Sequence, residues 1–102
     1  MGENVKEVLM RARELIAWEE NWCQGVAARD KNGREVEPMS ELANSWCAVG
    51  AIRKVCVDRG VAPYDIVAAL KKELGYGYTL PGFNDSHSHD EVLAVFDRAI
   101  SA

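Results

Sequence analysis

The chain has 102 residues, of which 48% are apolar and 27% are charged, and its net charge is −4. This length and composition are typical of one folded domain, so we expect a single helical domain over residues 1–102. The negative net charge argues against binding to a nucleic-acid backbone, which favours basic proteins. No apolar run approaches the roughly 20 residues that span a bilayer, and acidic residues interrupt the N-terminal segment where a signal peptide would be apolar. The sequence therefore predicts a cytoplasmic protein without a nucleic-acid or membrane partner.

The chain has three cysteines, Cys23, Cys47 and Cys56, and no two of them have C-x-x-C spacing. An odd number excludes a complete set of disulfides, and the spacing excludes a zinc site made of cysteines alone. We expect all three to be reduced and buried, because an unpaired cysteine behaves as a small apolar side chain.

Both histidines, His87 and His89, lie in the polar run Asp85–Asp90. Imidazole and carboxylate groups bind zinc, but the N-terminus of a helix, which is predicted here, repels a cation. We therefore expect two solvated histidines at a polar helix end. The sequence predicts no metal and no other cofactor.

The first predicted helix begins at Asn4, a favourable cap residue, and runs to about Glu19 or Glu20. Its apolar residues recur at spacings of three and four, which is typical of a helix that buries one face. They are Val5, Val8, Leu9, Ala12, Leu15 and Ile16.

Helical spacing stops between Trp22 and Pro38. Within this segment Asp30–Gly33 is a strong turn signal, and it predicts a small β-hairpin with strands at Val26–Arg29 and Arg34–Val36. Because an isolated hairpin is marginally stable in water, we expect it to pack against the helices.

A second helix is predicted from Leu42 to Val57, with a cap at Ser40 or Ser45 and with Gly60 at its end. The segment is apolar on most sides, which is typical of a central helix. Glycine in a helix interior costs about 1 kcal/mol relative to alanine. We therefore expect Gly50 to be buried where a neighbouring helix crosses closely.

Pro63 is expected at the first position of a third helix, which Gly75 ends. The glycine-rich segment Tyr76–Asp85 is predicted to be a loop. Ser88 and Glu91 form a capping box, so the last helix begins there and continues to the C-terminus. The predicted fold is mainly α, a compact bundle of about four helices with a small β-hairpin between the first and second helices.

The sequence has no G-x-G-x-x-G, P-loop, H-E-x-x-H or G-x-S-x-G motif, so it assigns no catalytic residues. Cys47 lies in the most apolar stretch, where a thiol is inert. Polar residues in loops beside a rigid helical body are frequent ligand-binding residues. The candidates of this kind are Trp22, Arg29, Asn84, Asp85 and His87.

Arg29 is expected to reach the Asn84–Asp85 pair, because the short hairpin needs an anchor and a guanidinium matches a carboxylate with two hydrogen bonds. Two readings of this contact remain open. It is either a structural lock between the hairpin and the start of the last helix, or part of a ligand site near Trp22.

Four blocks of sequence carry a family resemblance: Trp22–Gly25, Trp46–Ile52, Asn84–Asp85 and Asp97–Ile100. Together they give the pattern W-x-x-G … W-C-x-x-G-A-I … N-D … D-R-A-I. The chain resembles, over most of its length, a small bacterial and phage family catalogued as a domain of unknown function. Members of that family often have tryptophan where this chain has Phe83, a departure that keeps the aromatic character. The resemblance implies a cytoplasmic single-domain protein and brings no reaction, cofactor or partner.

Two function classes follow from these observations. Without catalytic signatures and with mild charge, the chain is expected to be a non-enzymatic interaction or regulatory module, whose partner is another protein or a second copy in a homodimer. The alternative is a small-molecule-binding or enzymatic site built around Arg29, Asn84, Asp85 and His87.

Overall fold

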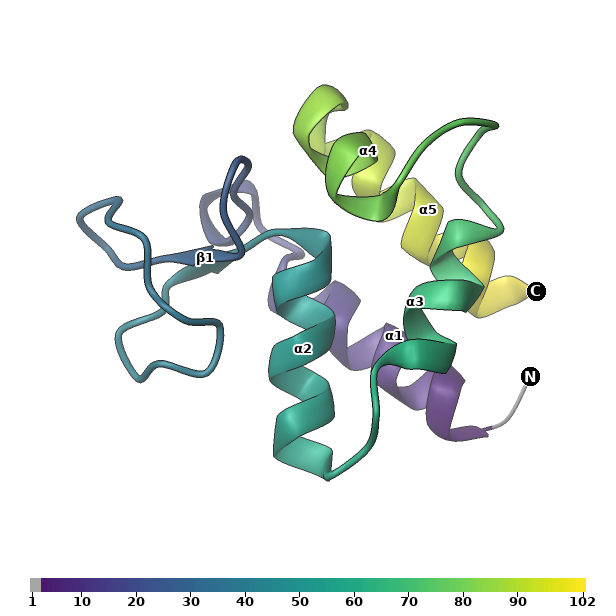
Figure 1. Ribbon diagram of the computed structural model, residues 1–102, viewed down its shortest axis with the longest axis horizontal. Helices are drawn as coiled ribbons and strands as arrows, with labels where there is room; N and C mark the ends of the chain where they lie inside the picture. The colour runs from purple at the N-terminus through teal and green to yellow at the C-terminus, as the bar shows by residue number, and fades with distance from the viewer. Residues whose placement is uncertain (1–2) are drawn as a thin grey trace.

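The computed structural model describes residues 3–102. Its regular elements are five α-helices, a short 3₁₀-helix and a two-stranded sheet (Figure 1). The fold class is as predicted, mainly α with a small antiparallel pair of strands between the first two helices. The elements are α1 (Glu3–Leu15), the 3₁₀-helix η1 (Glu19–Asn21), β1 (Ala28–Arg29), β2 (Ser45–Trp46), α2 (Ala48–Arg59), α3 (Tyr64–Lys71), α4 (Leu80–Ser86) and α5 (His89–Ser101).

The core lies between the apolar sides of α1, α2 and α5, and α3 and α4 close it on the remaining sides. Because each helix presents apolar residues at helical spacing, these sides face one another when the helices pack. The segment between β1 and β2 projects from this helical body (Figure 1). The largest fully buried side chains include Leu9, Ile16, Ile52, Leu70 and Phe96.

Helix α1 ends at Leu15, and the prediction that it continues to Glu19 or Glu20 is wrong. Trp18 is in an extended conformation and is 71% exposed, so it does not continue the buried stripe. The carbonyl of Ile16, which would accept a hydrogen bond from a continuing helix, instead accepts one from the Nε2 of His89 at 2.6 Å. Tertiary bonding therefore ends this helix early.

The predicted turn at Asp30–Gly33 is confirmed, with Gly33 at φ +83° and Asp30 donating its N–H to the carbonyl of Arg34 at 2.8 Å. The predicted pairing of Arg34–Val36 with the first strand is present, with Val36 donating its N–H to the carbonyl of Ala28 at 3.1 Å, but these residues do not form a regular strand. Arg34–Val36 contributes a single bridge between Glu35 and Arg29, and the regular partner of β1 is β2. Burial explains why β2 is the regular partner of β1, because this pairing places the buried side chain of Trp46 beside Ala28.

Helix α2 begins at Ala48, six residues later than predicted, because Ser45 and Trp46 are paired in the sheet. Neither predicted serine caps it. Cys47 is the cap residue, and its Sγ accepts a hydrogen bond from the N–H of Gly50 at 3.3 Å. Gly60 ends α2 at φ +68°, as predicted.

The prediction of a loop over Tyr76–Asp85 is wrong, because α4 occupies its second half. Thr79 caps α4 by accepting from the N–H of Gly82 at 3.1 Å, and proline in the first turn costs no hydrogen bond. Helix α3 ends at Lys71 rather than near Gly75, since the next residues bond with i→i−3 spacing.

The predicted capping box at Ser88 and Glu91 is present at the start of α5. Ser88 Oγ accepts from the Glu91 N–H at 3.2 Å, and the Glu91 carboxylate accepts from the Ser88 N–H at 2.9 Å. These hydrogen bonds to the charged form lower the pKa of Glu91. The prediction succeeds because both residues of this motif act within one turn.

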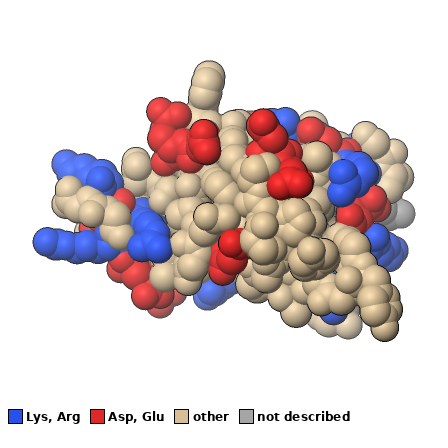
Figure 2. Space-filling model, turned by 90° about the horizontal axis from the view of Figure 1, so that it is seen from above, with Lys and Arg blue, Asp and Glu red and all other residues tan. Residues whose placement is uncertain are grey.

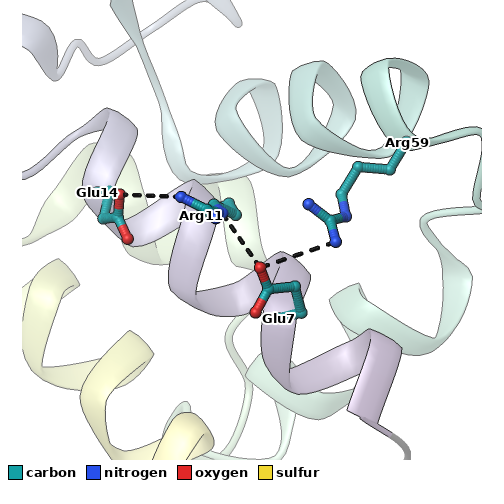
Figure 3. Close-up of polar contacts among 4 residues, drawn as sticks. All are labelled: Glu7, Arg11, Glu14 and Arg59. Atoms are coloured by element: carbon teal, nitrogen blue, oxygen red, sulfur yellow. Dashed lines mark hydrogen bonds and ion pairs between the residues drawn. The ribbon is translucent and has the colours of Figure 1, made fainter.

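Ion pairs at the surface connect α1 to two other helices. Glu7 Oε1 accepts from Arg11 at 3.1 Å and lies 3.7 Å from Arg59 at the end of α2 (Figure 3). Arg13 Nε lies 2.8 Å from Asp97 on α5, and this contact raises the pKa of Arg13. Because these groups are partly exposed, each pair contributes only about 0 to 1 kcal/mol.

Within residues 3–102, no helix has both the length and the apolar character needed to cross a bilayer.

Candidate functional site

The structure brings four of the five candidate residues to one place, where α4 and the start of α5 meet the segment 22–25. Trp22 is half-buried in that segment, Asn84 and Asp85 are in the last turn of α4, and His87 follows α4. The fifth candidate, Arg29, donates to the carbonyl of Gln24 in that segment and to the carbonyl of Gly33, and not to Asn84 or Asp85. The convergence depends on α4, which turns the Asn84 side chain towards the core.

Asn84 is the centre of this cluster and is 0% exposed. Its Oδ1 accepts from the indole Nε1 of Trp22 at 2.8 Å and from the backbone N–H of Ala48 at 3.0 Å. Its Nδ2 donates to the carbonyl of Cys23 at 3.1 Å and to Oδ1 of Asp85 at 3.1 Å. Two acceptor and two donor positions are all the bonds that an amide side chain offers. Asn84 therefore joins α4, the segment 22–25 and the first turn of α2 with its full bonding capacity.

Asp85 and Gln24 reinforce the same junction from its exposed side. Asp85 Oδ1 accepts from the backbone N–H of Gly25 at 2.9 Å. Gln24 Nε2 donates to the carbonyls of Asn84 at 3.0 Å and of His87 at 3.1 Å. The predicted connection between the strand-bearing segment and the start of the last helix exists, with these groups as its members.

The predicted pair between Arg29 and Asp85 is wrong. Arg29 donates from one terminal nitrogen to the carbonyl of Gly33 and from the other to the carbonyl of Gln24, each at 3.0 Å. Both acceptors lie in the same segment as Arg29. The guanidinium therefore stabilises the turn-bearing segment internally, while Asp85 Oδ1 accepts from the Gly25 N–H and from Asn84 Nδ2.

His87 is half-buried, and the prediction that its ring is solvated is wrong. The ring stacks on Phe83 with centroids 3.7 Å apart, and Tyr78 meets it edge-on at 5.1 Å. Its Nδ1 lies 2.9 Å from the carbonyl of Phe83. Since a carbonyl can only accept, Nδ1 is the donor in this contact.

His89 contributes to the site although sequence reasoning placed it in solvent. Its ring is buried, lies 5.4 Å from the ring of Trp22, and donates from Nε2 to Ile16. A histidine one residue after a capping serine resembles an ordinary polar helix start, so the sequence offers no signal for this role. The contact depends on where α1 ends.

The three cysteines are free and buried, as predicted. Burial raises the pKa of each thiol, and for Cys47 the hydrogen bond from Gly50 offsets part of the rise. A raised pKa keeps the thiol protonated and unreactive. The arrangement of Cys47 is therefore that of a helix cap, not of a nucleophile.

Among residues 3–102, no three His, Cys, Asp or Glu side chains lie close enough together to hold a metal ion.

Asp85→Ala is expected to lower the free energy of unfolding by about 1 to 3 kcal/mol, because it removes the acceptor that the Gly25 N–H and Asn84 Nδ2 share. Urea denaturation measures the change. Asp85→Asn is the matched control, since its amide oxygen still accepts from Gly25. A loss in the asparagine variant as large as in the alanine variant would contradict a role for this hydrogen bond.

The native thiols are expected to react with iodoacetamide at pH 7 at least about tenfold more slowly than the same thiols in urea, because burial disfavours the thiolate. A raised folded-state pKa also means that the unfolded chain loses these protons first. The free energy of unfolding should therefore fall as the pH rises above 9.0, the ordinary cysteine value. Mass spectrometry of labelled peptides checks the first expectation, and equal native and denatured rates would refute it.

Comparison with known proteins supports the family resemblance. A family model described as "Family of unknown function (DUF6197)" matches residues 1–102. No curated protein and no solved structure matches the chain. The match covers every block of the W-x-x-G … W-C-x-x-G-A-I … N-D … D-R-A-I pattern, including the junction around Asn84. The chain belongs to this family of unknown function.

Proposed function

We propose that the chain is a non-enzymatic interaction module that binds another protein chain through the outer face of α3. The observation that carries this proposal is the exposed apolar surface of that helix. Tyr64 is 80% exposed, and Ala68 is exposed one turn further along. Large aromatic side chains on a surface often anchor protein contacts.

The outer face of α3 is also hollowed. Pro63, Tyr64, Val67, Ala68 and Lys71 line a depression of about 380 Å³. An apolar side chain of a partner would lose water on entering it, and the stem of Lys71 would cover the edge. Its shape and chemistry therefore suit a side chain of a partner protein.

The polar junction around Asn84 supports a structural role better than a ligand site. The Asn84 amide uses all its bonding positions internally, and the guanidinium of Arg29 donates to two backbone carbonyls. A ligand there would have to displace these bonds. The alternative function, a small-molecule or enzymatic site around Arg29, Asn84, Asp85 and His87, retains one supporting observation in the partly exposed ring of His87.

The surface charges favour neither a nucleic acid nor an extended anion. Figure 2 shows Lys and Arg side chains at the end of the molecule that carries the turn after β1, with acidic side chains beside them. Lys31 and Arg34 are exposed at that turn, and Glu35 and Glu37 follow directly. The electrostatic potentials of positive and negative side chains this close together cancel at distances of about a Debye length.

The test uses the immobilised full chain in a lysate of the native cell, with bound proteins quantified by mass spectrometry. Tyr64→Ser is expected to lower capture of the specific partner at least about tenfold, because it removes the aromatic anchor. Leu42→Ser is the matched control, since Leu42 is similarly exposed, at 68%, in the segment between the strands.

Two results would contradict the proposal. One is a partner whose capture survives Tyr64→Ser and is lost with Leu42→Ser. The other is a small molecule that co-purifies with the parent chain and is lost with His87→Ala, detected by native mass spectrometry. The second result would favour the alternative site.

A further inference from the structure

The charges on α3 are arranged in the order that an antiparallel copy of the same helix requires. Asp65 lies in the first turn, and Lys71 and Lys72 lie at the end, where Lys72 keeps helical backbone angles. All three side chains are exposed. Among the residues that the structure describes, neither Asp65 nor Lys72 forms an ion pair within the chain.

Helical geometry places these residues on two edges of one face. Residues seven apart lie almost directly above one another, about 10 Å apart along the axis. Asp65 and Lys72 therefore share one edge, and Tyr64 and Lys71 share the other. Ala68 lies midway between both pairs, and its small side chain allows close approach of a second helix at that point.

We infer that the occupant of the α3 face is a second copy of this chain, packed antiparallel across a two-fold axis near Ala68. The inference rests on the proposed function and names its partner. A two-fold axis perpendicular to the helices brings each residue opposite the residue equally far beyond the midpoint on the same edge. Asp65 of one copy then faces Lys72 of the other, and Tyr64 faces Lys71. Both contacts occur twice, so the face complements itself.

The hollow beside Tyr64 fits the same arrangement. Its lining includes Tyr64, Val67, Ala68 and Lys71, which are residues of the self-complementary face. In the antiparallel pair, the Tyr64 ring of each copy enters the hollow of the other and lies along the stem of its Lys71, a favourable position for a cation beside an aromatic ring. The two helix dipoles also oppose each other in this orientation. A different partner would have to provide the same charges in the same order.

Sedimentation velocity on the full chain tests the inference. Because an eight-residue helix gives an interface below the standard size, association is expected to be weak, with the mass rising from 11.3 kDa towards twice that value between about 10 µM and 1 mM. Asp65→Lys alone and Lys72→Asp alone each place like charges opposite each other and should weaken association about tenfold. Glu41→Lys, an exposed reversal between the strands, is the matched control and should leave association unchanged.

An equimolar mixture of the two single variants provides the decisive measurement. In a mixed pair, the introduced lysine of one chain faces the introduced aspartate of the other, and the two unchanged residues face each other as in the parent. The mixture should therefore associate like the parent although neither variant does so alone. Circular dichroism of each variant confirms that the reversal has not unfolded α3.

A parent chain that stays monomeric at about 1 mM, single reversals that associate like the parent, or a mixture that does not recover would each overturn the inference. If association with a second copy is absent while capture of a different protein is lost with Tyr64→Ser, the inference fails and the proposed function stands. If self-association is absent and Tyr64→Ser changes no capture, both fail.

Discussion

Asn84→Ala is expected to lower the free energy of unfolding by about 3 to 5 kcal/mol, the largest effect of any single substitution proposed for this chain. The side chain is 0% exposed and makes four hydrogen bonds. Alanine leaves the Trp22 indole, the Ala48 N–H and the Cys23 carbonyl without partners in or near the core. An unsatisfied buried polar group costs about 1 to 3 kcal/mol, and three are created at once.

Urea denaturation followed by tryptophan fluorescence measures this loss directly, because Trp22 is one of the groups that loses its partner. Asn44→Ala is the matched control, since Asn44 is exposed and should change stability by less than about 0.5 kcal/mol. Asn84→Asp is expected to be as harmful as alanine, because it replaces the donor with a buried carboxylate next to Asp85. An Asn84→Ala variant as stable as the parent would show that this amide does not hold the junction together.

Sequence reasoning predicts best the elements whose signals act within one or two turns. The capping box of Ser88 and Glu91 and the helix end at Gly60 depend only on local backbone groups, and both are confirmed. The turn at Asp30–Gly33 is confirmed for the same reason. In each case the side chain or the glycine supplies what the local backbone requires.

Elements that depend on distant partners are predicted poorly. The residues around Ser45 and Trp46 are compatible with a helix. These two residues instead pair with β1 as a strand, so α2 begins later than predicted. Pro81 and Gly82 indicate a loop when they are considered alone, so the sequence does not predict helix α4. The proline is tolerated because it lies in the first turn, after the Thr79 cap.

In the candidate site, too, the sequence predicts which residues lie close together better than it predicts which groups bond. Four of its five residues come together, since each is a polar or aromatic group in a segment beside the helical body. The partners themselves were not predictable, because the choice of Gly25 rather than Arg29 for Asp85 depends on how the segment 22–25 crosses α4. The sequence favours a solvated His89, because the acceptor of its ring, the Ile16 carbonyl, becomes free only when α1 ends early.

The prediction for Gly50 is correct about its burial and wrong about the element that packs against it. It is buried, as expected, but the chain that approaches it is the backbone of Ala27, not a helix. A β-carbon built on Gly50 would lie 2.0 Å from the Ala27 carbonyl oxygen and 2.9 Å from its carbon, far inside contact distance. The same oxygen accepts a hydrogen bond from the Cys47 N–H at 3.1 Å, so it cannot move away without breaking that bond.

Gly50→Ala is therefore expected to lower the free energy of unfolding by about 3 kcal/mol, even though alanine is the better helix former. Gly75→Ala is the matched control, because its β-carbon meets only the Tyr78 ring at an ordinary 3.7 Å and should be nearly neutral. Thermal and urea denaturation of both variants measure the difference. If Gly50→Ala is as stable as the parent, the segment before β1 must be able to move away from α2, and the close contact at Ala27 is not what requires glycine at this position.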